Sequence, residues 1–215
     1  MANTNAPQGL KPVKHLSGAA WNQQANLYFV DVNDTNAYYL GDCVQSASGV
    51  AGDTLTGAPA VTLYGTRNAA SDSGAIRGVV VGVGTAVNTP GGAFPQQFNP
   101  TNLDIIYIPT TKAQAYYVWV VDDPSVIFEA QTDTLASAPY NYNAKLFVAN
   151  APTAPVNQSQ SYVQGSTAAS GNTAYPLKLL GAPWRADNDL TGTAQYAKLY
   201  VKINNHELAN ASAGV

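Results

Sequence analysis

Few residues in this sequence of 215 could carry out acid–base catalysis. It has two histidines, His15 and His206, and two glutamates, Glu129 and Glu207. Histidine is the commonest general base, but neither histidine lies in a His-Glu-x-x-His or His-x-Glu pattern. We therefore interpret both as histidines at the protein surface.

One group of carboxylates has a spacing that could serve glycoside hydrolysis. Asp122, Asp123 and Glu129 flank a single predicted turn, and glycosidases use two carboxylates about 5–10 Å apart. However, Asp-Asp-Pro is also a typical turn sequence, because aspartate accepts a hydrogen bond from the turn backbone. The loop is too short to supply alone the roughly 6–8 oxygens of a calcium site. We favour the turn.

Nucleophile and cofactor patterns are equally sparse. Cys43 is the single cysteine and lies in an apolar segment, which is typical of a buried, inert thiol. There is no Gly-x-Ser-x-Gly or Cys-x-x-Cys sequence. Gly82-Val83-Gly84 is half of a dinucleotide fingerprint without its third glycine or its helix. The sequence thus predicts a protein that is not an enzyme, with no catalytic, metal-binding or cofactor-binding residues.

The composition favours contact with other proteins. Only 11% of residues are charged and the net charge is −3, without a cluster of Lys and Arg, so we expect no nucleic-acid partner. No apolar run is long enough to span a membrane and no secretory signal is evident; we expect synthesis in a cytoplasm. A weakly polar surface costs little free energy to desolvate. The 13 tyrosines also suit a half-wet interface.

Short β-branched and aromatic segments separated by Gly, Pro and Asn predict an all-β fold, either a β-sandwich or a jelly-roll-like barrel. The predicted strands are 26–32, 38–44, 60–64, 75–83, 103–108, 116–121, 126–131, 145–149, 175–180 and 196–203. Long polar loops are expected at 46–57, 85–102 and 151–172, and one helical turn at 133–138.

Three of these strands allow sharper predictions. Segments 116–121 and 126–131, joined by Asp-Asp-Pro, predict a hairpin. Segment 196–203 alternates cleanly, which predicts that Ala197, Leu199, Val201 and Ile203 face the core.

The first 25 residues differ from the remainder. Pro7, Pro12 and several glycines predict an extended N-terminal arm, ahead of a single β domain over 26–215. A solvated tail would rarely carry the apolar residues Leu10, Val13, Leu16 and Trp21, so we predict an arm that docks on a partner. The predicted contact residues are Leu10, Pro12, Val13 and Trp21.

Three stretches resemble tailed-bacteriophage head proteins of the decoration, or cement, type. They are residues 1–15 (MANTNAPQGLKPVKH), residues 119–131 (WVVDDPSVIFEAQ), and residues 177–181 (LKLLG) followed by 201–206 (VKINNH). The resemblance implies a structural virion protein on the outer capsid surface that bridges and stabilises major capsid subunits. It also implies a homo-oligomer, for which we favour a trimer.

The alternative interpretation is a virion surface adhesin or carbohydrate-binding module. Tyrosine rings can stack on sugars, and this interpretation assigns glycan binding to Tyr116, Tyr140 or Tyr142. It predicts no binding to empty capsids.

Overall fold

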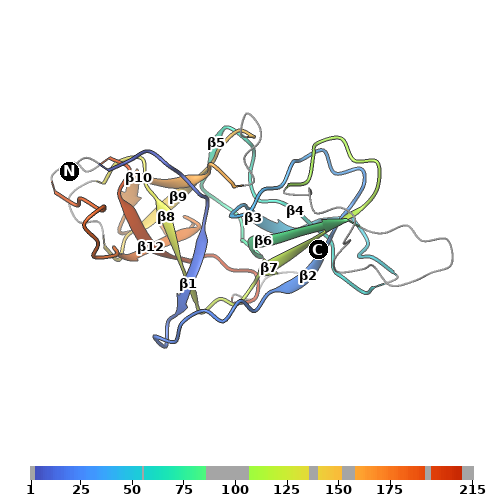
Figure 1. Ribbon diagram of the computed structural model, residues 1–215, viewed down its shortest axis with the longest axis horizontal. Helices are drawn as coiled ribbons and strands as arrows, with labels where there is room; N and C mark the ends of the chain where they lie inside the picture. Colours follow the sequence, from blue (N-terminus) through green and yellow to red (C-terminus); the bar gives the residue numbers. More distant parts are fainter. Residues whose placement is uncertain are drawn as a thin grey trace.

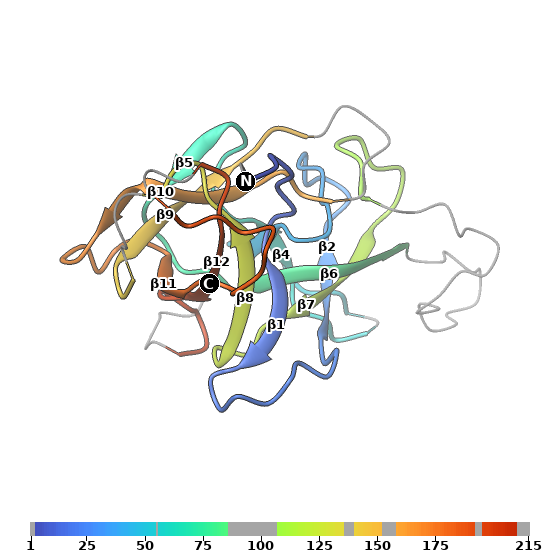
Figure 2. The same ribbon diagram turned by 60° about the vertical axis from the view of Figure 1, so that its left-hand side comes forward.

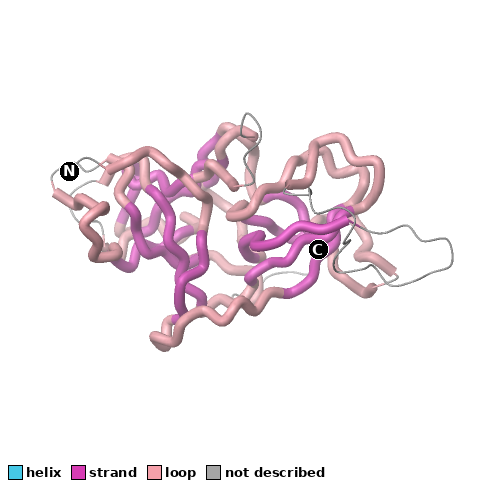
Figure 3. Tube along the Cα trace, viewed as in Figure 1, coloured by secondary structure: helices cyan, strands magenta, loops and turns pink. Residues whose placement is uncertain are grey.

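Strands make up all the regular structure of the part of the chain that the computed structural model describes, residues 3–54, 56–85, 107–135, 140–151, 158–191 and 195–209. These strands form two antiparallel sheets that lie next to each other along the long axis of the molecule (Figures 1 and 3). The predicted loop 85–102 and strand 103–108 fall mainly outside the described residues.

Sheet A contains seven strands in the order β1-β8-β12-β11-β9-β10, with β5 also paired to β9. Its strands are β1 (Lys11–His15), β5 (Ala69–Ser71), β8 (Val126–Gln131), β9 (Asn143–Val148), β10 (Tyr162–Ala169), β11 (Leu177–Gly181) and β12 (Lys198–Ile203).

Sheet B contains five strands in the order β2-β7-β6-β3-β4. They are β2 (Asn26–Val30), β3 (Cys43–Ser46), β4 (Val61–Leu63), β6 (Gly78–Thr85) and β7 (Tyr116–Val121). Central strand β7 is YYVWVV, and such nearly continuous apolar sequence is expected where both faces are covered.

One hydrophobic core joins the two sheets. Phe128, Leu146 and Leu199 of sheet A belong to the same cluster of buried side chains as Val79 and Val118 of sheet B. The prediction of an all-β sandwich is therefore confirmed.

The alternation predicted for the last strand is also confirmed. The relative exposure is 2% or less for the side chains predicted to face the core, Ala197, Leu199, Val201 and Ile203. The residues between them are partly exposed. A strand places successive side chains on opposite faces, so its sequence alone identifies the core face.

The predicted hairpin is wrong, although the bounds of both strands are right. β7 pairs with β2 and β6 in sheet B, whereas β8 pairs with β1 and β12 in sheet A. Residues 122–125 thus carry the chain from one sheet to the other. Their turn is closed by the N–H of Val126, which donates to the carbonyl of Asp123 at 3.1 Å. A turn sequence shows that the chain reverses, but not which strands pair.

Three strands and one turn depart from the sequence-based expectation. β1 lies in the predicted arm, β10 lies within the loop predicted at 151–172, and β5 lies in a segment without apolar alternation. β1 tolerates Pro12 because it is an edge strand, where a missing N–H leaves no ladder position empty. Thr134 makes a β-bridge with Gln195 where a helical turn was expected over 133–138, and residues 136–138 of that turn lie outside the described residues.

The N-terminal segment is part of the β domain rather than a free arm. β1 pairs antiparallel with β8, and Figure 2 shows the two strands lying next to each other. Leu10 is 1% exposed, and its N–H donates to the carbonyl of Gly41 at 3.0 Å. The division at residue 25 is therefore not a structural boundary.

A crossing of two glycines holds this segment in place. Gly9 and Gly41 have φ values of 66° and 91°, in the left-handed region that favours glycine. A Cβ on Gly9 would lie 2.3 Å from the carbonyl oxygen of Gly41, and one on Gly41 would lie 2.3 Å from that of Gln8. Only two glycines allow the backbones to approach this closely.

A buried ion pair ties sheet A to sheet B. The guanidinium of Arg67 donates to both carboxylate oxygens of Asp42, at 2.6 and 3.2 Å, and to the carbonyls of Ala37 and Ala149. Asp42 immediately precedes β3, while Ala149 immediately follows β9. The Asp42 side chain is fully buried.

Replacing Leu199 by alanine should lower the free energy of unfolding by about 2–5 kcal/mol, because the substitution removes most of a buried side chain and leaves a cavity in the core. Denaturant unfolding measures this change. Lys202→Ala in the same strand, on the opposite face, is the matched control and should change stability by less than about 0.5 kcal/mol. Equal effects of the two substitutions would contradict the facing of β12.

Deleting residues 2–20 should destabilise the protein strongly, because the deletion removes both β1 and the buried Leu10. Leu10→Ala alone should cost about 2–5 kcal/mol. Urea unfolding monitored by circular dichroism tests both variants. A deletion variant with the midpoint of the full-length protein would show that the segment does not contribute to the fold.

Arg67→Met should cost about 3–5 kcal/mol, because it leaves the Asp42 carboxylate buried without its counter-charge. Lys145→Met is the matched control, because its ion pair with Asp72 is exposed and should contribute little to stability. In a double-mutant cycle with Asp42→Asn, the double variant should lose less than the sum of the single losses. Additive losses would argue against direct coupling.

Candidate functional site

Three of the four residues predicted to contact a partner line one groove of about 260 Å³. Leu10, Pro12 and Trp21 come from the N-terminal segment, Val81 comes from β6 of sheet B, and Leu40 comes from the segment before β3. Val13 is not among the lining residues, although its carbonyl accepts the N–H of Trp21 at 3.2 Å. The groove is a mostly apolar seam between β1 and sheet B.

The roles available to these four residues differ. Leu10 belongs to the hydrophobic core, so its assignment as a contact residue is corrected to that of a core residue. Pro12, Val13 and Trp21 keep partial exposure. Their contact with a partner remains a prediction.

Trp184 is the most prominent apolar side chain on the described surface. Its relative exposure is 101%, the highest among the exposed large hydrophobic residues. It lies between β11 and β12 in the sequence GAPWRADND. Sequence reasoning missed it because the segment has no periodicity. The available signal was a large aromatic residue between a proline and charged residues, where a core position is not expected.

The loop that carries Trp184 is fixed to the strands beneath it. Arg185 donates to both carboxylate oxygens of Glu129 on β8, at 2.9 and 3.1 Å. Asp187 accepts from Lys198 on β12 at 3.1 Å. The Asn188 side chain bonds both the N–H and the C=O of Lys198, at 2.8 and 3.0 Å. These contacts attach the residues that follow Trp184 to strands β8 and β12 of sheet A.

The three carboxylates considered for glycoside hydrolysis each bind a different partner. Asp122 is buried and accepts from Tyr28 Oη at 2.5 Å and from Asn26 at 2.8 Å. Burial and the bond to Asp122 raise the pKa of Tyr28 to about 12. Glu129 is held by Arg185. Asp122 is thus an internal acceptor that anchors β2 to the crossing between the sheets.

Asp123 is engaged at the turn surface. Its pKa is lowered because hydrogen bonds from Ser125 and the proximity of His15 outweigh partial desolvation. His15 Nδ1 lies 3.2 Å from Asp123 Oδ2 and 3.2 Å from Ser125 Oγ. This contact joins the end of β1 to the crossing between the sheets.

His206 is not a surface residue, contrary to the sequence-based interpretation. It is 1% exposed, and burial lowers its pKa. Its Nδ1 accepts the N–H of Leu208 at 3.0 Å. The sequence-based interpretation was wrong because a polar residue after the last strand is usually exposed, and the sequence does not show which segments pack over it.

Cys43 is buried, as the apolar sequence around it predicts. Burial raises the pKa of its thiol, which disfavours the nucleophilic thiolate. Within the described residues, no group of three or more His, Cys, Asp and Glu side chains could hold a metal ion. Nor does the described chain include a helix with the length and apolar character needed to cross a membrane.

The tyrosines assigned to glycan binding lie on different sheets. Tyr116 begins β7 of sheet B, whereas Tyr140 and Tyr142 precede β9 of sheet A. Tyr116 and Tyr140 pack against the core, and only Tyr142 is well exposed. None of the three lines the groove of about 260 Å³ or a second cavity of about 480 Å³.

Comparison with protein-family models, curated proteins and solved structures yields no match in any of the three.

Proposed function

We propose that this chain is a structural virion protein that binds the outside of a bacteriophage capsid lattice and stabilises it by bridging major capsid subunits. The single observation that carries the proposal is the complete exposure of Trp184 on a loop clamped to sheet A. The sequence resemblance to head decoration proteins supplies the partner. A fully exposed tryptophan offers a large apolar area with one polar N–H, which suits burial against another protein.

Rigid presentation makes Trp184 suited to anchoring an interface. Tryptophan is enriched among the residues that dominate binding energy, because one side chain buries a large area. The ion pairs to Glu129 and Lys198 order the loop before binding. An ordered loop loses less conformational entropy when a partner docks.

The sparse charge of the chain supports the same role. With only 11% charged residues, much of the surface can be desolvated without removing ions from water. Many copies on one lattice act together, so each copy needs only modest affinity. Symmetric lattice positions favour a homo-oligomer, a trimer in this proposal.

A surface adhesin is the second candidate function. A polar cavity lined by Tyr162 and Tyr196 favours it, because tyrosine combines apolar area with a polar tip. The two functions differ in what the protein binds: a capsid lattice in one, a glycan in the other.

Trp184→Ala should reduce affinity for capsids about tenfold or more, as for loss of an interface anchor. The measurement is co-sedimentation of the purified protein with expanded, empty heads of the parent phage that lack this protein. The wild type should bind saturably at a fixed ratio to the capsid protein, and the heads should then resist heating better.

Leu208→Ala is the matched control, since Leu208 is another exposed apolar residue and lies outside the clamped loop. Both variants should unfold within about 0.5 kcal/mol of the wild type, as expected for surface positions. Absence of wild-type binding to intact heads would refute the capsid role. Equal losses in the two variants would refute Trp184 as the anchor.

A further inference from the structure

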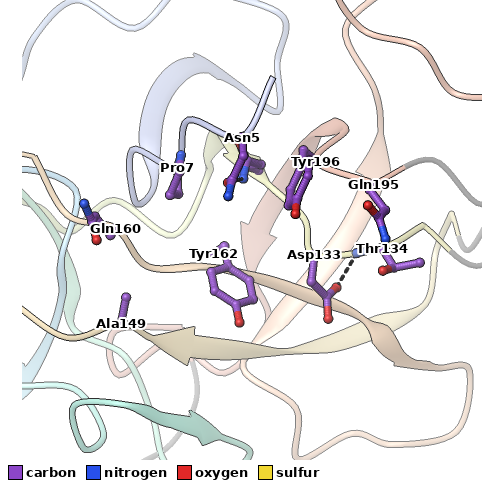
Figure 4. Close-up of a pocket in the computed structure, with 10 residues that line it drawn as sticks. Asn5, Pro7, Asp133, Thr134, Ala149, Gln160, Tyr162, Gln195 and Tyr196 are labelled. Atoms are coloured by element: carbon purple, nitrogen blue, oxygen red, sulfur yellow. Dashed lines mark hydrogen bonds between the residues drawn. The ribbon is translucent and has the colours of Figure 1, made fainter. Parts of the chain in front are cut away.

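A second cavity, of about 480 Å³, lies at one end of sheet A. Its walls come from the N-terminal segment, the end of β8, the start of β10 and the residues before β12. Figure 4 shows Tyr162 between Gln160 on one side and Asp133 on the other, with Asn5 and Tyr196 nearby. The volume is within the range of about 300–1,000 Å³ typical of small-molecule sites.

Tyr162 presents a fixed aromatic ring in this cavity. Its ring stacks on Phe147, with centroids 4.8 Å apart and planes 15° from parallel. The next residue, Val163, is fully buried, which places Tyr162 on the outer face of β10. Burial and the nearby Asp133 carboxylate raise the pKa of Tyr162. Its phenolic hydroxyl can donate or accept a hydrogen bond.

Tyr196 is held in a conformation that a bulky residue rarely adopts. Its φ is 58°, in the left-handed region. Flanking contacts maintain this conformation: Gln195 forms a β-bridge with Thr134, and the carbonyl of Ala197 accepts the N–H of Thr132 at 2.9 Å. Backbone strain of this kind persists only where the surroundings enforce it, and it gathers at binding sites.

The cavity carries little charge, and its one carboxylate is fixed in place. Asp133 accepts from the N–H of Thr134 at 2.6 Å and from Ser166 Oγ at 2.7 Å, which sets the carboxylate in one orientation. The lining includes no Lys, Arg or His, and amides from Asn5 and Gln160 supply much of its polarity. A carboxylate with no cation beside it repels anionic ligands. Amides can donate and accept hydrogen bonds and carboxylates can accept them, so both can bind adjacent hydroxyl groups of a ligand.

We propose that this cavity binds a neutral saccharide of one or two rings. Tyr162 and Tyr196 provide aromatic surface for the C–H face of a sugar ring. Asp133 accepts hydrogen bonds from its hydroxyls, and the amide of Gln160 can both donate and accept. The inference does not depend on the capsid role, because Trp184 is not among the residues lining the cavity.

The test is saturation-transfer-difference NMR followed by calorimetry on the full-length protein. The probes are glucose, galactose and N-acetylglucosamine, with their disaccharides cellobiose, lactose and chitobiose. At least one of these six should bind with a Kd on the order of 1 mM. Failure of all six to bind at about 20 mM, roughly twenty times that Kd, would overturn the proposal.

Tyr196→Gly is the sharpest variant, because glycine accepts a φ of 58° without strain and the fold should keep or gain thermal stability. It should weaken sugar binding about tenfold by removing an aromatic contact. Gln160→Ala should also weaken it, whereas Tyr142→Ala, an exposed tyrosine outside the cavity, should not. Equal binding by all three variants would place the sugar elsewhere and refute this site.

The two sites are tested separately. Tyr196→Gly should leave co-sedimentation with capsids unchanged, and Trp184→Ala should leave sugar binding unchanged. Loss of capsid binding with sugar binding retained would therefore bear on the capsid role alone.

Discussion

The arrangement of the two sheets depends on the ion pair between Arg67 and Asp42. Both charged groups leave water, which is costly unless each is paired and hydrogen-bonded. Arg67 meets most of this condition, because its two terminal nitrogens bind both oxygens of Asp42 and the carbonyls of Ala37 and Ala149, although its buried Nε has no partner among the described residues. Asp42 also accepts the N–H of Tyr39 at 2.9 Å. Few other relative positions of the sheets would satisfy these groups. The apolar core favours contact between the sheets, but the directional bonds select one arrangement.

Both candidate cavities are linked to this pair through the chain next to it. Gly41 precedes Asp42 and crosses Gly9, so the position of Asp42 fixes where the N-terminal segment passes. On one side of the crossing, Leu10 and Pro12 border the apolar groove. On the other side, Asn5 and Pro7 border the polar cavity. A segment whose sequence resembles an irregular tail thus forms a wall of both sites.

Sequence alone predicted the features that depend on local periodicity. The core face of β12 and the bounds of β7 and β8 follow from alternation and from continuous apolar residues. The pairing of β7 with β8 was predicted wrongly, because pairing depends on contacts between residues distant in sequence. Burial of Leu10 and His206 likewise depends on segments that pack over them. Exposure of Trp184 could not be predicted from periodicity, because the residue lies in a loop and periodicity identifies only the buried face of a strand or helix.

A protein that bridges capsid subunits must transmit load between its contacts, and load is lost if its two sheets slide. Hydrophobic contact alone resists sliding weakly, because it is not directional. Hydrogen bonds weaken steeply as their angle departs from linearity, so bonds across the seam oppose small displacements. Arg67 supplies such bonds at the seam, to Asp42 next to β3 of sheet B and to the carbonyl of Ala149 next to β9 of sheet A. The buried polar groups therefore suit a protein whose proposed role is to hold other molecules in place rather than to transform them.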